Sequence, residues 1–241
     1  MAWRSLSELN EDMVKNFKQM SIVSSKDVEN AFLNVPRAAF LPEYLHDEAY
    51  ADYPVRGDDH LHMSAPHMYA TVLEALDLKE GMSFLNIGSG TGYFSMLVGY
   101  IVGSQGTNHG VELRANLVEH ANECCEEFFM YFPKMKKQIC YPQFIAGNCF
   151  HVDPTAHKYD RLYCGAACPR ERFEFLLELI KPGGLIVVPS GNKLLKLERL
   201  IQTGVNENVV SDVCFESLVL PVDDEHFPKL RFASFKQKAK K

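Results

Sequence analysis

The fold of this chain is decided by residues 83–92, which read Ser-Phe-Leu-Asn-Ile-Gly-Ser-Gly-Thr-Gly. The first five residues are mostly apolar and predict a short buried strand, and the three glycines predict a tight turn. Residues 93–102 are almost wholly apolar and predict a helix that begins directly after the turn. A strand, a glycine-rich turn and a helix in this order are typical of the first unit of a doubly wound α/β sheet.

The alternation of strand and helix continues to residue 188. Strands joined by helical crossovers run parallel and are covered by helices on both faces. The sequence therefore predicts a Rossmann-like α/β fold with a mostly parallel central sheet. Its further strands are predicted at 107–113, 143–146, 159–164 and 185–188, and its further helices at 116–129 and about 171–180.

Different patterns flank this core on both sides. Before it, Ser25 predicts the N-cap of a helix, and 47–62 has the polar and aromatic composition of a packed loop. After it, strand-like runs at 196–203, 213–220 and 230–235 predict antiparallel additions to one edge of the sheet. The sequence shows neither an internal repeat nor a Gly/Ser-rich linker, so we expect one domain.

The composition argues against several classes of protein. The formal net charge of −6 disfavours a general nucleic-acid binder, and no apolar run has the roughly 20 residues that cross a bilayer. The N-terminus lacks the apolar segment of a signal peptide, so we expect a cytoplasmic protein, with the nucleus as an alternative. Seven cysteines without paired secretory or metal-ligand spacing fit a reducing compartment and predict no metal site.

An acidic residue supports a ligand site at the glycine-rich turn. Ligands of doubly wound sheets lie beyond the carboxyl ends of the strands, where Gly88, Gly90 and Gly92 let the backbone approach a bound group. Glu112 stands about twenty residues further on, at the end of the second predicted strand, where an acid can accept hydrogen bonds from both ribose hydroxyls. The turn and the acid together predict a nucleoside cofactor.

Two other interpretations of the turn are open. A glycine-rich turn can simply tighten a strand-to-helix connection, although the spacing to Glu112 favours a ligand. A nicotinamide oxidoreductase would need the dinucleotide fingerprint G-x-G-x-x-G, and the position of its last small residue holds Tyr93. A cofactor without a pyrophosphate therefore fits the turn better.

Four segments carry a resemblance to a known family over nearly the whole chain. They are 63–68 (Met-Ser-Ala-Pro-His-Met), 85–92 (Leu-Asn-Ile-Gly-Ser-Gly-Thr-Gly), 159–167 (Tyr-Asp-Arg-Leu-Tyr-Cys-Gly-Ala-Ala) and 179–184 (Leu-Ile-Lys-Pro-Gly-Gly). With these segments the chain resembles the protein-L-isoaspartate (D-aspartate) O-methyltransferases. The first segment is specific to that family, whereas the others are shared more widely among methyltransferases.

The resemblance implies a class I methyltransferase fold and S-adenosyl-L-methionine as the cofactor. Members of the family transfer its methyl group to the free α-carboxylate of isoaspartyl residues in damaged proteins and peptides, which are therefore the expected partners in protein repair. Ser64 matches the serine at the family's active site and is the expected catalytic residue. The turn and the resemblance assign the cofactor to Leu61, His62, Met63, Ser64, Tyr69, Asn86, Gly88, Ser89, Gly90, Gly92, Glu112, Gly147 and Asn148.

Several residues depart from the family's pattern. Asn86 and Asn148 stand where aspartates are usual, and Tyr69 and Asp223 replace an expected histidine and threonine. Strings such as 108–113 (Asn-His-Gly-Val-Glu-Leu) resemble the domain-containing relatives of the enzyme, in which a long C-terminal extension is associated with ubiquitin-ligase recruitment. A cofactor-binding recognition module with weak or no transferase activity is therefore the alternative function.

These patterns together divide the expected single domain, 1–241, into three parts. We expect a helical N-terminal portion with the substrate loop at 1–80, a cofactor-binding core at 81–192, and antiparallel strands at 193–241. The chain is predicted to act as a monomer, with neither nucleic acid nor a membrane as a partner.

Overall fold

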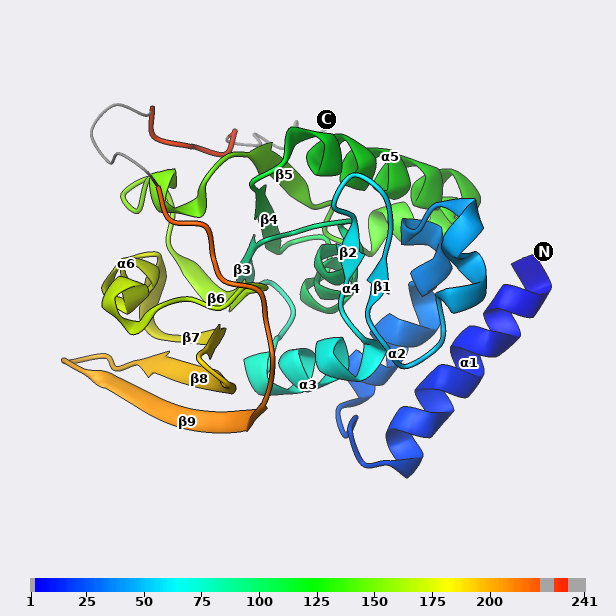
Figure 1. The fold of residues 1–241 in the computed structure, drawn as a ribbon, viewed down its shortest axis with the longest axis horizontal. Coiled ribbons are helices and arrows are strands. Elements are labelled where there is room, and N and C mark those ends of the chain that lie inside the picture. Colours follow the sequence, from blue (N-terminus) through cyan, green and yellow to red (C-terminus); the bar gives the residue numbers. More distant parts are fainter. Residues whose placement is uncertain (1–2, 222–227, 234–241) are drawn as a thin grey trace.

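A seven-stranded sheet forms the centre of the computed structural model, which describes residues 3–221 and 228–233, with side chains from residue 9. The strands lie in the order β5-β4-β3-β6-β7-β8-β9 (Figure 1). Neighbours from β5 to β7 are parallel, and β8 and β9 continue the sheet as antiparallel strands. The predicted mostly parallel sheet is therefore confirmed. Its strands are β3 (Ser83–Ile87), β4 (Thr107–Glu112), β5 (Gln143–Ala146), β6 (Tyr159–Cys164), β7 (Ile180–Ser190), β8 (Lys193–Arg199) and β9 (Val205–Asp212).

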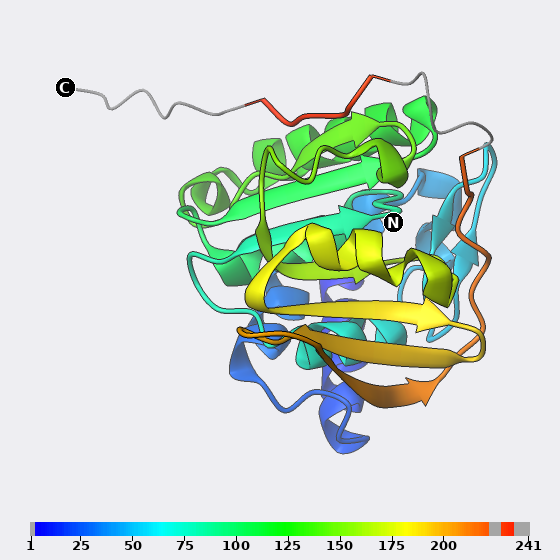
Figure 2. The ribbon, with the colours of Figure 1, turned by 90° about the vertical axis from the view of Figure 1, so that its left-hand side faces the viewer.

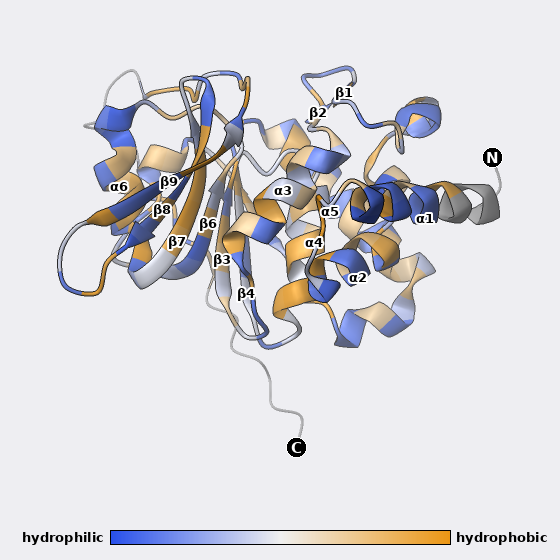
Figure 3. Cartoon of the chain, turned by 90° about the horizontal axis from the view of Figure 1, so that it is seen from below, coloured by the Kyte–Doolittle hydropathy of each residue, from blue (hydrophilic) through white to orange (hydrophobic). Residues whose placement is uncertain are grey.

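Helices cover both faces of the sheet, as Figures 2 and 3 show from two sides. Helices α1 to α5 share one hydrophobic core with Phe84 of β3 and Val187 of β7. On the other face, α6 and the loops near it share a second core with Leu85 and Leu162. Alternate residues of β3 thus enter opposite cores, as the two-residue period of a strand requires. The helices are α1 (Trp3–Gln19), α2 (Lys26–Asn34), α3 (Pro66–Leu76), α4 (Tyr93–Val102), α5 (Ala115–Tyr131) and α6 (Phe173–Glu178).

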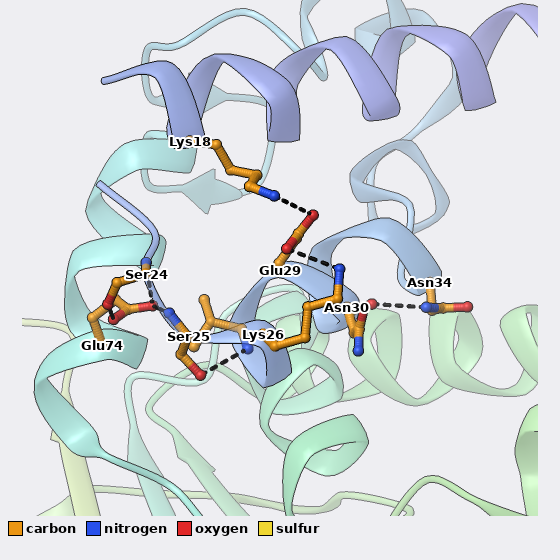
Figure 4. Close-up of polar contacts among 9 residues, drawn as sticks. Lys18, Ser24, Ser25, Lys26, Glu29, Asn30, Asn34 and Glu74 are labelled. Atoms are coloured by element: carbon orange, nitrogen blue, oxygen red, sulfur yellow. Dashed lines mark hydrogen bonds and ion pairs between the residues drawn. The ribbon is translucent and has the colours of Figure 1, made fainter. Parts of the chain in front are cut away.

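Polar contacts link the first three helices (Figure 4). Glu29 of α2 accepts hydrogen bonds from Lys18 of α1 at 3.1 Å and from Lys26 at 3.0 Å. The N–H of Ser25 donates to Glu74 of α3 at 2.9 Å, and the Ser25 hydroxyl accepts the N–H three residues further on, which confirms the predicted cap. Exposed pairs of this kind add little stability, so the shared hydrophobic core holds these helices together.

The flanking regions differ from their predicted elements. The predicted loop 47–62 contains part of a small antiparallel ribbon, β1 (Val55–Arg56) and β2 (His62–Met63). The predicted helix at about 171–180 is shorter, because β7 begins already at Ile180. The strand β2 ends at Met63, so its pairing with β1 fixes the position of the residues directly before Ser64.

The predicted strands beyond residue 193 are only partly correct. The run 196–203 lies partly in β8, and β9 pairs with β8 along 205–212. The run 213–220 is not a strand, because it crosses the carboxyl ends of the sheet and forms a single bridge, between Ser217 and Ala167. Leu230 likewise forms only a bridge, with Val152. Asp223 and residues 234–241, which include the end of the predicted strand 230–235, lie outside the described residues.

Candidate functional site

A cleft of about 450 Å³ lies at the carboxyl ends of the parallel strands. The strand order reverses between β3 and β6, and this is the place where doubly wound sheets bind their ligands. The floor of the cleft comes from the segments that follow β3 to β6, and its opposite wall comes from the ribbon and from a segment that follows β9. The lining includes Ile87, Gly88, Val111, Glu112, Leu113, Arg114, Gly147, Asn148, Cys149, Gly165 and Ala166 on the floor, and Arg56, His62, Ser64 and Cys214 to Val219 on the wall.

The glycine-rich turn has the backbone conformation that its sequence predicts. Gly88, Gly90 and Gly92 have φ values of +76°, +52° and +83°, in the left-handed region that favours glycine. A Cβ on Gly88 would meet nothing closer than the Cα of Gly165, 3.9 Å away, so this side of the turn is open. A Cβ on Gly92 would lie 3.1 Å from the Cβ of Ala121. The first glycine therefore opens the turn to the cleft, and the last allows α5 to pack closely against it.

Glu112 ends β4 with its carboxylate at the floor of the cleft and is only 8% exposed. Its Oε2 accepts the N–H of Gly90 at 2.9 Å, and its Oε1 accepts the N–H of Arg114 at 3.2 Å. Among the side chains described, those of residues 9–221 and 228–233, it has no ion-pair partner. A carboxylate has about four acceptor sites, so two remain for donors from a ligand. The predicted acid, Glu112, is thus hydrogen-bonded directly to the predicted glycine-rich turn.

The substrate loop brings Ser64 to the opposite wall of the cleft. Leu61 and Met63 are buried, whereas His62 and Ser64 line the cleft. The N–H of Ser64 donates to the Oη of Tyr69 at 3.2 Å. Burial raises the pKa of Tyr69, so its phenol stays protonated at neutral pH. Tyr69 therefore supports the loop from α3, behind the cleft.

The two asparagines occupy different surroundings. Asn86 is 1% exposed, and its Nδ2 donates to the hydroxyl of Ser95 in α4 at 3.0 Å, away from the cleft. Asn148 lines the cleft, and its Oδ1 accepts the N–H of Phe150 at 3.1 Å. The Nδ2 of Asn148 donates to the carbonyl of Val219 at 3.0 Å. One substitution thus lies behind the turn, and the other lies in the floor of the cleft.

The structure divides the predicted cofactor residues into two groups. One group lines the cleft: His62, Ser64, Gly88, Glu112, Gly147 and Asn148. The other group lies behind the lining residues or within the turn: Leu61, Met63, Tyr69, Asn86, Ser89, Gly90 and Gly92. The first group offers side chains and open backbone to a ligand, and the second fixes the position of the first.

The sequence analysis did not identify the residues that cover the cleft opposite its floor. Residues 213–221, hereafter the cover segment, are joined to the loop after β6 by hydrogen bonds between Ala167 and residues 216 and 218. Glu216 in the cover segment also pairs with Arg56 of β1, with 2.9 Å between Oε1 and Nη1. These partners are 160 residues apart in the sequence, so no pattern within either segment could predict the contact.

The described part of the chain offers neither a membrane-spanning helix nor a cluster of metal-ligating side chains. No helix there is long and apolar enough to cross a membrane. The histidine, cysteine and acidic side chains described there form no group of three that could hold a metal ion. The cleft at the carboxyl ends of the parallel strands is the candidate functional site.

Known proteins match this chain over most of its length. The family profile of protein-L-isoaspartate(D-aspartate) O-methyltransferase matches residues 7–226. The protein-L-isoaspartate O-methyltransferase of Methanococcus aeolicus is 35% identical over 181 residues, covering 75% of this chain and 79% of its own. That of Methanopyrus kandleri is 33% identical over 186 residues, covering 76% and 77%.

Solved structures agree with these sequence matches. A Plasmodium falciparum chain assigned to protein-L-isoaspartate O-methyltransferase, solved in complex with S-adenosyl-L-homocysteine, has a TM-score of 0.72 at 25% identity and covers 87% of this chain and 98% of its own. A second structure of that name has a TM-score of 0.71 at 22% identity, which supports the fold alone. The fold, the cleft and the matches agree, and the chain belongs to the protein-L-isoaspartate(D-aspartate) O-methyltransferase family.

Proposed function

We propose that this protein transfers a methyl group from S-adenosyl-L-methionine to the α-carboxylate of isoaspartyl residues in proteins and peptides. The observation that carries the proposal is the meeting of Glu112, Gly88 and Ser64 in one cleft. These residues come from β4, the turn after β3, and the loop before α3, and each belongs to a segment singled out in the sequence. The family of the chain supports the same activity.

The residues of the cleft fit S-adenosyl-L-methionine. The open side of Gly88 would admit the amino-acid end of the cofactor, and the free acceptor sites of Glu112 would bind its ribose. Gly147 and Asn148 would lie at its adenine, because they follow the next strand along the sheet. When bound, the cofactor supplies an electrophilic methyl group on a positively charged sulfur.

The chain's own residues need to provide placement rather than proton transfer. The α-carboxylate of an isoaspartyl residue is already ionised at neutral pH, so the reaction requires no general base. The Ser64 hydroxyl would donate a hydrogen bond to this carboxylate and hold one of its oxygens toward the cofactor. The cover segment and the ribbon would exclude water from the reacting atoms.

A methyl-transfer assay tests the proposal. The purified chain is incubated with labelled S-adenosyl-L-methionine and with isoaspartyl and aspartyl versions of one peptide, and released methanol is measured. We expect methylation of the isoaspartyl peptide alone, and a strong reduction in the variant Ser64→Ala. Equal labelling of both peptides, or labelling of neither, contradicts the proposed substrate.

A recognition module that binds the cofactor without turnover is the second candidate. It is favoured by the side chain of Asn86, which faces Ser95 and carries no charge into the region behind the turn. Calorimetry with S-adenosyl-L-homocysteine separates the two candidates when it is combined with the methyl-transfer assay. Binding without transfer to any isoaspartyl peptide supports the module.

We also propose that the chain acts as a monomer in the cytoplasm or nucleus. The cleft is lined by residues of one chain, and every proposed contact comes from that chain, which supports the monomer. Light scattering coupled to gel filtration measures the mass directly. Localisation of the tagged protein in cells tests the compartment.

A further inference from the structure

A buried arginine lies directly behind the loop that carries Ser64. Arg37 belongs to the short helix η1 (Arg37–Phe40) and is 0% exposed, although a guanidinium keeps its charge in proteins. Among the described residues, its Nε and Nη1 atoms have no hydrogen-bond partner. Within the described part of the chain, Arg37 forms no ion pair within 4 Å, although the charge of Asp52 acts favourably on it from a greater distance. A buried cation with so little compensation is unfavourable for folding.

Three contacts hold this guanidinium in place. Its central carbon lies 5.8 Å from the ring centroid of Tyr69 and 5.6 Å from that of Tyr93, which are cation–π distances. Its Nη2 donates a hydrogen bond to the carbonyl of Met63 at 3.3 Å. The arginine thus connects an aromatic cluster to the residue that precedes Ser64.

Arg37 and Tyr69 bind the two ends of a single peptide unit. Its carbonyl, from Met63, accepts the hydrogen bond from Arg37, and its N–H, from Ser64, donates to Tyr69. The peptide unit is planar and includes the Cα of Ser64. Rotation of this plane would break both hydrogen bonds and leave buried groups unpaired, so the plane is fixed on both sides.

We propose that Arg37 and Tyr69 are positioning residues that clamp the Met63–Ser64 peptide and thereby hold the Ser64 hydroxyl toward the cleft. This inference rests on the proposed methyl transfer, in which the Ser64 hydroxyl has to be held at a fixed place in the cleft. The Tyr69 hydroxyl interacts with the side chain of Ser64 as well as with its N–H, so Tyr69 also orients the serine hydroxyl that lines the cleft. The buried cation also adds a positive potential beside the wall that would receive this anion.

Two substitutions remove the hydrogen bonds of the clamp and keep side chains of similar size. Tyr69→Phe keeps the ring and loses the acceptor for the Ser64 N–H, and Arg37→Met keeps most of the side-chain length and loses the donor. Tyr163→Phe is the matched control, because Tyr163 belongs to the same buried core and its hydroxyl has no partner among the described residues. All three changes leave the lining of the cleft intact.

Amide hydrogen exchange measures the clamp directly and does not depend on catalysis. We expect the Ser64 N–H to exchange roughly 10-fold faster in Tyr69→Phe and in Arg37→Met than in the wild type, since each loses a hydrogen bond to the peptide unit. Exchange in Tyr163→Phe should match the wild type. Unchanged exchange at Ser64 in both clamp variants overturns the proposal.

A double-mutant cycle with Ser64→Ala measures the consequence for the reaction. We expect Tyr69→Phe to lower kcat/KM for an isoaspartyl peptide by roughly 10-fold, with unchanged affinity for S-adenosyl-L-homocysteine. In the Ser64→Ala background, the same change should have almost no effect, because the group that it positions is gone. A full loss in both backgrounds shows a merely structural role and overturns the proposal.

The two measurements keep this inference separate from the proposed function. A wild-type chain that transfers no methyl group to any isoaspartyl peptide contradicts the proposed function, while exchange at Ser64 still decides whether the clamp exists. An active wild type with additive losses in the cycle leaves the proposed function intact and rejects the clamp as a positioning device.

Discussion

Replacement of Glu112 by glutamine is the sharpest test of the cofactor site. The carboxylate is 8% exposed, and its two oxygens accept the N–H groups of Gly90 and Arg114. A glutamine amide has one acceptor and one donor group, so in either orientation its NH2 faces a backbone N–H. The variant therefore loses one internal hydrogen bond together with the negative charge.

Two effects set the expected magnitude for Glu112→Gln. A hydrogen bond to a charged group contributes about 1.5–3 kcal/mol, so a ribose hydroxyl that loses this acceptor weakens cofactor binding by about 10- to 150-fold. An unpaired buried N–H lowers the free energy of unfolding by about 1–3 kcal/mol. For a chain of this size, Tm then falls by about 2–4 °C for each kcal/mol.

Calorimetry with S-adenosyl-L-homocysteine and a thermal melt measure the two effects separately. Glu119→Gln is the control, because Glu119 is exposed on α5 and is not among the residues lining the cleft. We expect the control to bind and melt like the wild type. A Glu112→Gln variant that stays folded and binds within about threefold of the wild type refutes the assignment of Glu112 to the ribose.

Three further substitutions test other parts of the structure. Gly92→Ala puts a Cβ at φ +83° and 3.1 Å from the Cβ of Ala121, and should lower the free energy of unfolding by about 1–3 kcal/mol in urea titrations. Asn148→Asp removes the donor to the carbonyl of Val219, and should speed amide exchange in the cover segment. Burial lowers the pKa of His109 from 6.5 to about 3, so between these values the unfolded chain binds the additional proton. Stability should therefore fall by up to about 1.4 kcal/mol per unit as the pH decreases through this window, and urea titrations of His109→Gln should lack this contribution.

The core of the sheet could be predicted from the sequence because its signals are local. Strands at 83–87, 143–146 and 159–164 and the helix at 93–102 have the predicted bounds. Each strand is a short segment of mostly apolar residues, and the three glycines predict a turn with positive φ. The acid at position 112 also follows from spacing alone, since β4 lies beside β3 in any such sheet.

The cover segment and the arginine behind Ser64 could not be predicted in this way. Residues 213–220 have the apolar composition of a strand, but their hydrogen-bond partners lie in the loop after β6 rather than in a neighbouring strand. Arg37 would be expected at the surface, where arginines usually lie, and it is fully buried against two tyrosines. Both features depend on contacts between distant segments, which a local pattern does not contain.

The two asparagines that depart from the family's pattern have different physical meanings. An aspartate at position 148 could still accept the N–H of Phe150, but it would face the carbonyl of Val219 as a second acceptor. Asparagine is thus the residue that caps the short helix η4 (Cys149–His151) and also donates to the cover segment over the cleft.

Asn86 does not line the cleft, so its replacement of an aspartate removes a buried charge behind the turn rather than a contact with the ligand. Its Nδ2 donates to Ser95, and nothing in the structure explains why its Oδ1 has no partner among the described residues. The oxygen of Asn148 keeps a second acceptor site for a donor on the cofactor. The change at position 148 exchanges one acceptor oxygen for a donor but leaves the other oxygen in the cleft, and the change at position 86 lies outside the cleft. The site therefore retains Glu112 and Ser64 as methyl transfer requires, and transfer explains the position of Ser64 in the cleft wall better than binding alone does.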